Sequence, residues 1–310
     1  MRWLTYAEWT SGAPHTVTGS VLVCPRLYSP QLDNTRQILA YLPPTYAHGS
    51  RRYPVLYMHD GQNLFDRETS SIGEWCVDET MEDLSEEGIE AIVVGIPHMG
   101  ANRVHELSPY ACSRSGSLGL GREYLSFVVD TVKPLIDGSF RTSTESSMTG
   151  IMGSSMGGLI SLFALFQYPD VFSLCGAMSP ALWFDDFRIF EDVKSGWGTS
   201  CRIYLDTGTE EVDLSIPDSP IAVEYRYRLR KVLGEETPIS NAALSTLWLD
   251  DVRRLQQVIR NRGLDGSQLM YVEEEADHSE ASWARRLPKA LQFLLSLRAT
   301  PASQISQATR

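Results

Sequence analysis

The most constraining feature of the sequence is the segment 153–157, Gly-Ser-Ser-Met-Gly, which joins two apolar runs. Residues 147–152 predict a short buried strand, and residues 156–167 are apolar nearly all round, which is typical of a buried helix. A GxSxG pattern between a strand and a helix holds its central serine on a strained turn. The pattern predicts a nucleophilic Ser155, with the backbone N–H of Met156 holding an oxyanion at the positive helix end.

Glycine on both sides of this serine has a steric reason. Gly153 and Gly157 lack a Cβ, so the strand and the helix can approach each other closely at the turn. A glycine-rich structural turn is the alternative interpretation. A phosphate-binding loop is excluded, because the chain has no GxxxxGK[ST] motif.

The rest of the chain alternates between strand-like and helix-like patterns. The predicted strands are 17–23, 36–42, 53–59, 91–96, 147–152, 174–178, 202–206 and 269–273. The predicted helices are 79–87, 122–136, 156–167, 247–262 and 279–297. The alternation, with an antiparallel start, predicts an α/β fold: a doubly wound, mostly parallel eight-stranded sheet with helices on both faces.

We expect a single catalytic domain over residues 1–298 and a disordered C-terminal tail over 299–310, which is polar and aperiodic. Two connections are longer than the fold requires. Residues 110–121 are rich in glycine and serine, and 212–245 form a candidate lid insertion that includes a short basic helix near 223–233.

Composition excludes several classes of function. The net charge of −12 offers no basic face to nucleic acid, and no apolar run approaches the ~20 residues of a membrane span. We therefore expect a cytoplasmic protein without nucleic-acid or membrane partners. The five scattered cysteines predict neither a disulfide framework nor a metal site, and Cys112, in a polar loop, predicts an exposed thiol.

Chain order selects the general base. In α/β-hydrolases the triad follows the order serine, acid, histidine, and His278 is the one histidine after Ser155. The acid is expected in the loop that follows the strand 202–206, where Asp206, Glu210 and Glu211 compete. Spacing alone does not choose among these three carboxylates.

The chain resembles the esterase D-like ("putative esterase") family of α/β-hydrolases, whose members include feruloyl and siderophore esterases and S-formylglutathione hydrolase. The resemblance is carried by 53–65 (YPVLYMHDGQNLF), 150–158 (GIMGSSMGG), 168–172 (YPDVF) with 179–183, and Asp277-His278. These segments span roughly residues 36 to 295.

The resemblance implies roles for individual residues. It implies the Ser155 nucleophile and the His278 base, and an acid three residues after the loop glycine, which is Glu211. It also implies that the backbone N–H of Gln62 is an oxyanion donor, because Gln62 follows the third strand. A neighbouring His59–Asp60 pair is then expected to shape the loop.

Aromatic and polar side chains after the strand ends are candidates for the substrate pocket: Asn63, Trp183, Phe184 and Trp283. Their rings either stack on a substrate or simply pack beside the core. We expect a serine-dependent carboxylic-ester hydrolase that uses an acyl-enzyme intermediate and needs no metal or organic cofactor. Its substrate is expected to be a small-molecule or glycan-linked ester, and the protein to be a monomer or a homodimer. The alternatives are an acyltransferase and a non-catalytic carbohydrate- or partner-binding module.

Overall fold

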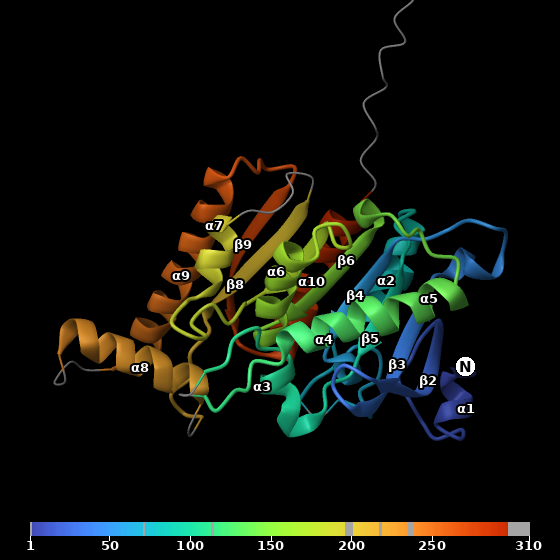
Figure 1. The fold of residues 1–310 in the computed structure, drawn as a ribbon, viewed down its shortest axis with the longest axis horizontal. Coiled ribbons are helices and arrows are strands. Elements are labelled where there is room, and N and C mark those ends of the chain that lie inside the picture. The colour runs from blue at the N-terminus through green and yellow to red at the C-terminus, as the bar shows by residue number, and fades with distance from the viewer. Residues whose placement is uncertain are drawn as a thin grey trace, which may run out of the picture.

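The computed structural model describes residues 2–70, 72–112, 115–195, 201–216, 219–234 and 239–296. The expected tail, 299–310, lies outside the described residues. Within these ranges nine strands form one sheet in the order β1-β2-β3-β5-β4-β6-β7-β8-β9 (Figure 1). The strands are β1 (Leu4–Thr5), β2 (Ser20–Ser29), β3 (Asn34–Leu42), β4 (Val55–His59), β5 (Ile92–Ile96), β6 (Thr149–Ser154), β7 (Leu174–Met178), β8 (Arg202–Glu210) and β9 (Leu269–Asp277).

The sheet is mostly parallel with an antiparallel start, which confirms the prediction of the fold class. Strands β4 to β9 pair in parallel, whereas β1, β2 and β3 pair antiparallel and β3 joins β5 antiparallel. The prediction of eight strands is wrong by one. Strand β1 has two residues, too few to produce a periodic pattern, and it exists because Leu4 and Thr5 pair with Val23 and Leu22 of β2.

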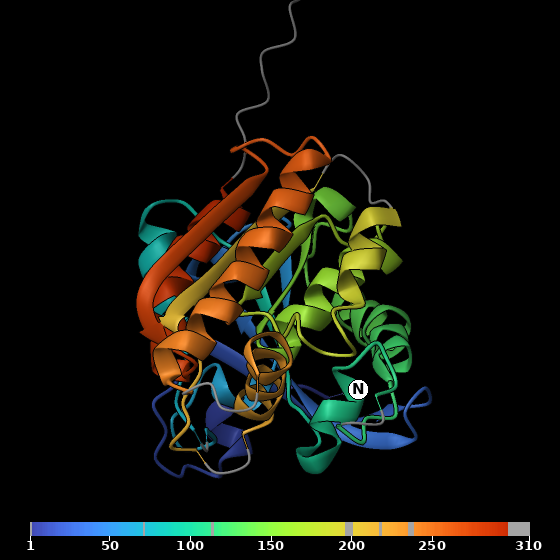
Figure 2. The same cartoon turned by 90° about the vertical axis from the view of Figure 1, so that its left-hand side faces the viewer.

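Helices cover both faces of the sheet (Figures 1 and 2). They are α1 (Tyr6–Trp9), α2 (Val77–Glu86), α3 (Arg103–Glu106), α4 (Gly121–Phe127), α5 (Lys133–Ser139), α6 (Met156–Gln167), α7 (Ile189–Ser195), α8 (Pro220–Leu233), α9 (Asn241–Asn261) and α10 (Glu280–Leu295). Helices α2 and α10 share one buried cluster on one face, and α4 to α7 with α9 share the cluster on the other. None of the described helices is long and apolar enough to cross a bilayer.

The predicted helix 122–136 is interrupted. Helix α4 ends at Phe127, a wider π-helical turn covers Val128–Val132, and α5 continues from Lys133. Pro134 has no N–H and its ring crowds the carbonyl of residue 130, which disfavours regular α-helical hydrogen bonding at this point. The wider turn just before the proline accommodates the ring.

The long connection 212–245 contains α8 and the first turn of α9. In Figures 1 and 2, α8 lies beyond one end of the sheet, next to the beginning of α9. The Tyr225 hydroxyl of α8 donates to Asp251 Oδ2 of α9 at 2.8 Å, and Arg228 forms an ion pair with the same carboxylate at 2.5 Å. These contacts fasten α8 to α9.

Candidate active site

Ser155 lies on the sharp turn between β6 and α6. Its backbone has φ 55° and ψ −118°, a strained conformation for a residue with a Cβ. Its N–H donates to the carbonyl of Met178 in β7 at 2.9 Å, and its own carbonyl accepts from the N–H of Ala181 at 3.0 Å. A Cβ on Gly153 would lie 2.9 Å from the His59 ring, so only glycine fits this position. The local geometry is that of a nucleophile elbow.

His59 packs beneath this turn as a neutral, hydrogen-bonded side chain. Its Nδ1 lies 2.7 Å from the Tyr124 hydroxyl, and its Nε2 lies 3.1 Å from the Ser161 hydroxyl. Burial lowers the pKa of His59 to about 4. The ring therefore shapes the loop, as expected from the sequence.

The sheet order brings the predicted residues to one edge of the molecule. Ser155 follows β6, Ser179 follows β7, Glu211 follows β8, and His278 follows β9. These four strands are consecutive neighbours and run in parallel. Residues that follow parallel strands meet at the carboxyl edge of the sheet, where α/β proteins bind ligands.

Glu211 is the carboxylate that contacts the histidine. Its Oε2 lies 2.5 Å from His278 Nδ1, and its side chain is fully buried. Its Oε1 accepts from the backbone N–H of Gly208 at 2.6 Å and from the Ser179 hydroxyl at 2.5 Å. Hydrogen bonds on both oxygens orient the carboxylate toward the imidazole.

The two other candidate acids lie elsewhere. Glu210 is exposed. Asp206 is buried, forms an ion pair with Arg286 at 3.3 Å, and accepts from the Ser179 N–H at 3.1 Å. Burial raises the pKa of Asp206 to about 7, and the neighbouring Glu211 adds to the shift while Arg286 opposes it. Asp206 therefore holds Arg286 and the backbone of Ser179 next to Glu211.

Sequence reasoning gave neither Ser179 nor Arg286 a role beside Glu211. The Ser179 hydroxyl donates to Glu211 and accepts from Trp283 Nε1 at 3.1 Å and from Arg286 Nη2 at 3.0 Å. One donated and two accepted bonds use the full capacity of a hydroxyl group. A signal for Arg286 was available, because helical spacing from Trp283 places it on the buried stripe of α10.

Two indole rings hold His278 by edge contacts. The ring centroids of Trp248 and Trp283 lie 5.3 Å and 5.0 Å from the imidazole centroid, at nearly perpendicular angles. Trp248 Nε1 donates to the Thr207 hydroxyl at 3.0 Å, which fixes this ring to the end of β8. The histidine side chain remains 17% exposed, so one part of the ring still faces the surface.

The two residues expected to hold an oxyanion both lie at the start of helical turns. Met156 is the first residue of α6, where a backbone N–H has no acceptor within the helix. Gln62 lies in a short 3₁₀ helix, Gly61–Asn63, directly after β4. Gln62 and His98 also line a cavity of about 480 Å³. The side-chain Oε1 of Gln62 accepts a hydrogen bond from the backbone N–H of His98 at 3.2 Å. The ion pair of Asp60 with Arg103, 2.7 Å long, holds the loop in place.

The four predicted pocket residues are all buried. Asn63 is 3% exposed, Phe184 1%, Trp283 4% and Trp183 9%. Trp283 packs against Trp75 and His278, and Phe184 belongs to the core. Trp183 lines a cavity next to α8. A direct substrate contact of Asn63, Phe184 or Trp283 stays a prediction.

One group of described side chains has the spacing of metal ligands. Glu74, Cys76 and Glu79 each offer one ligand atom, all within 4.8 Å of one another. Burial raises the pKa of Cys76 to about 11, so its thiol is protonated and a poor ligand. The sequence prediction of an exposed thiol at Cys112 is wrong, because this residue is 8% exposed.

The chain is similar to known proteins in sequence and in fold. The uncharacterized protein YbbA of Bacillus subtilis (strain 168) is 25% identical over 265 residues, 84% of this chain and 92% of that protein. The siderophore triacetylfusarinine C esterase of Aspergillus fumigatus is 26% identical over 147 residues, 46% of this chain and 49% of that protein. The structure of siderophore hydrolase EstA from Aspergillus nidulans superposes with a TM-score of 0.65 at 21% identity, covering 90% of this chain and 95% of that one.

The family comparison covers most of the chain. The model of the family described as "Putative esterase" matches residues 29–294. That range contains the Ser155 turn, the Glu211 loop and His278. The protein therefore belongs to the putative esterase family, an α/β-hydrolase-fold family of ester hydrolases.

Proposed function

We propose that the protein is a serine-dependent carboxylic-ester hydrolase with Ser155 as nucleophile, His278 as general base and Glu211 as the acid. The observation that carries the proposal is the 2.5 Å contact between His278 Nδ1 and Glu211 Oε2, two strands from the strained Ser155 turn. A carboxylate at Nδ1 leaves Nε2 of the imidazole as the proton acceptor.

The reaction proceeds in two steps. The Ser155 hydroxyl attacks the ester carbonyl while His278 accepts the hydroxyl proton, and the backbone N–H groups of Gln62 and Met156 stabilise the oxyanion. The tetrahedral intermediate collapses, the alcohol leaves with the proton from His278, and an acyl-enzyme remains. Water, deprotonated by His278, then releases the carboxylic acid and regenerates Ser155.

The substrates to test come from chemistry and from relatives. The relative in Aspergillus fumigatus is named as a siderophore esterase, and another structural neighbour is titled ferulic acid esterase. Acetyl, butyryl, feruloyl and siderophore-type esters therefore form the first panel. Adding an alcohol as a competing acceptor separates hydrolysis from acyl transfer.

The test compares the wild type with the Ser155→Ala, His278→Ala and Glu211→Gln variants. Each is expected to lower kcat by about 10³-fold or more, because the three groups act as a unit. Glu210→Gln is the matched control from the same loop and should retain activity, since Glu210 is exposed. Full turnover by Ser155→Ala would overturn the proposal. If activity survives Glu211→Gln but is lost in Asp206→Asn, the triad acid is Asp206 and not Glu211.

A further inference from the structure

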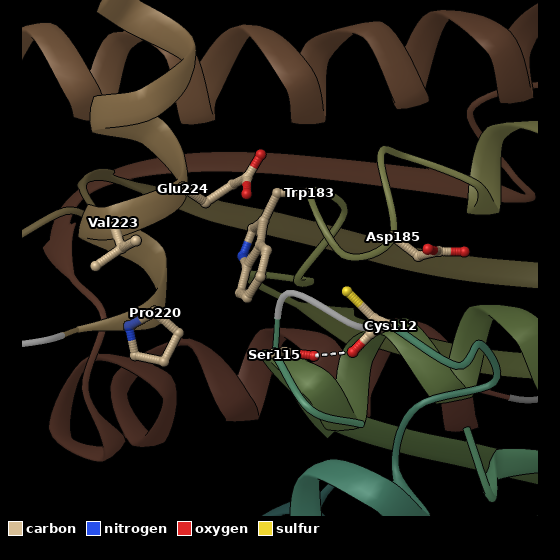
Figure 3. A pocket seen from close by; sticks show the side chains of 7 residues that line it. All are labelled: Cys112, Ser115, Trp183, Asp185, Pro220, Val223 and Glu224. Carbon is tan, nitrogen blue, oxygen red and sulfur yellow. Dashed lines mark hydrogen bonds between the residues drawn. The ribbon is translucent and has the colours of Figure 1, made fainter. Parts of the chain in front are cut away.

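A small cavity lies between α8 and the loop that follows β7 (Figure 3). Its volume is about 90 Å³. Trp183 and Asp185 line it from the β7 side, Val223 and Glu224 from α8, and Cys112 from the loop before α4. The reaction described above leaves this cavity without a role.

Trp183 brings an unused hydrogen-bond donor to this cavity. The residue is 9% exposed, and its buried Nε1 has no hydrogen-bond partner. Figure 3 shows the indole nitrogen on the edge of the ring that faces Val223 and Pro220 of α8. Buried indole N–H groups normally have an acceptor, as do Trp248 with Thr207 and Trp283 with Ser179. An unpaired donor beside a cavity is a candidate contact for an oxygen atom bound there.

The loop that carries Trp183 is joined to the Ser155 turn. The Ala181 N–H donates to the Ser155 carbonyl at 3.0 Å, and the Phe184 N–H donates to the Ala181 carbonyl at 3.2 Å. Trp183 therefore lies two residues after Ala181, which contacts the proposed nucleophile Ser155. A group bound against Trp183 is positioned relative to the proposed reacting serine.

We propose that this cavity is a substrate subsite and that Trp183 Nε1–H donates a hydrogen bond to a neutral oxygen of the ester substrate. The proposal rests on the proposed ester hydrolysis at Ser155. The acceptor is a carbonyl, ether or hydroxyl oxygen, because none of the described lining side chains is a cation that would hold a carboxylate, and Asp185 and Glu224 are themselves acidic. The cavity is small, so the bound group is a short one.

The experiment uses pairs of esters that differ only in one oxygen. 4-Nitrophenyl methoxyacetate and 4-nitrophenyl butyrate place an ether oxygen or a methylene in the acyl group, and 2-methoxyethyl and butyl acetate do so in the alcohol group. The preference for the oxygen-containing member, as a ratio of kcat/KM, is measured for the wild type and for Trp183→Phe. Intrinsic ester reactivity cancels when the two enzymes are compared.

We expect Trp183→Phe to reduce the preference in one of the two pairs by roughly three- to tenfold, the effect of one buried hydrogen bond. Trp3→Phe is the matched control, because Trp3 donates to Ser139 near the opposite edge of the sheet. It should leave both preferences unchanged. An equal loss for both members of each pair would overturn the proposal, and so would efficient turnover of 4-nitrophenyl hydrogen succinate.

A second variant tests the cavity from α8 without touching the indole. Val223 is 53% exposed, so Val223→Phe should fold while its larger ring enters the cavity. It should raise KM for the oxygen-containing ester more than it raises KM for a simple acetate; equal KM values before and after the change would reject the subsite. Loss of the subsite with intact acetate turnover leaves the proposed function standing, whereas an active Ser155→Ala variant removes the proposed function itself.

Discussion

Glu211 is held on both carboxylate oxygens by groups from three different strand ends. Gly208 lies near the end of β8, Ser179 directly follows β7, and His278 directly follows β9. Each contact is short and fully or largely buried, so small displacements change the orientation of the imidazole. Substitutions of the residues that contact Glu211 are therefore expected to affect activity.

The Ser179 hydroxyl is predicted to be a positioning group. Ser179→Ala removes the donor to Glu211 and leaves the N–H groups of Trp283 and Arg286 without this acceptor. We expect kcat to fall about tenfold with little change in KM, since Ser179 contacts the acid and not the substrate. Steady-state kinetics on an acetyl ester checks this split, with the melting temperature measured alongside; a rise in KM at constant kcat would contradict it.

The pKa of Asp206 predicts a pH dependence of stability. Burial raises it from 3.8 to about 7, so the folded protein binds this proton more tightly than the unfolded chain does. The stabilising contribution is full below about pH 4 and is lost as the pH rises through about 7. Burial likewise raises the pKa of Glu280 to about 7.

These two carboxyl groups should therefore make the stability fall between about pH 4 and pH 7, and His59, whose pKa is lowered to about 4, offsets part of this loss below about pH 6.5. Asp206→Asn should flatten this loss by removing one of the buried carboxyl groups, although Arg286 then lacks its ion pair and the variant is less stable throughout. Denaturant unfolding at several pH values measures the slope. Glu210→Gln, exposed in the same loop, should keep the wild-type slope, and an unchanged slope in Asp206→Asn would refute the assignment.

Ser155 and His278 could be named as candidates from the sequence, whereas the side chains that contact Glu211 from β7 and α10 could not. A strand, a GxSxG turn and an apolar helix are local patterns, and chain order then left His278 as the one candidate. Ser179 and Arg286 have no such pattern. They meet because β7 and α10 pack side by side in space, 107 residues apart in sequence.

At the scale of elements, β8 and β9 approach each other closely at Gly208 and Ala276, just before Glu211. A Cβ on Gly208 would lie 2.1 Å from the Ala276 carbonyl oxygen, and the strand pairing shifts register at this point. Gly208 is therefore required for close approach, and the irregular pairing turns the chain toward Glu211.

Gly208→Ala is expected to separate the ends of these two strands. We expect kcat/KM to fall at least about tenfold and the free energy of unfolding to fall by about 1–3 kcal/mol, the usual effect of overpacking. The backbone N–H that Glu211 accepts is retained, so the change is steric. Gly266→Ala serves as the control, because nothing lies within 4 Å of its Cβ position. Wild-type activity in Gly208→Ala would show that the strands can move apart without moving the acid.

The elements whose ends are marked by local sequence signals were predicted best. The strand 174–178 and the helix 156–167 have the predicted bounds, since proline, glycine and a change of periodicity mark their ends. Helix α9 begins six residues before the predicted 247, because Ser240 caps it within a segment that lacked an apolar period. Strand β1 has only two residues and forms by pairing with β2, so no local sequence pattern marks it.

At the scale of the whole molecule, a buried ion pair joins the antiparallel start of the sheet to the region before α4. Arg36 of β3 contacts Glu106 of α3 at 2.8 Å, with side-chain exposures of 1% and 3%. Both guanidinium amino groups bond to this carboxylate. A buried charge without its partner is strongly unfavourable.

Glu106→Gln should therefore lower the free energy of unfolding by about 3 kcal/mol, because the charge of Arg36 loses its counter-ion in a dry environment. Chemical denaturation followed by circular dichroism measures the change. For comparison, Asp250→Asn disrupts an exposed pair with Arg253 at 3.6 Å and should cost less than about 1 kcal/mol. Equal effects of the two substitutions would mean that water reaches the Arg36 pair.

The four consecutive strands that end at Ser155, Ser179, Glu211 and His278 have a consequence for synthesis on the ribosome. The turn at residue 155 is made more than 120 residues before His278 and Arg286. A nascent chain therefore carries the serine for a long interval without this imidazole and guanidinium. The proposed ester cleavage can begin only after β9 has paired with β8 and α10 has packed against the sheet.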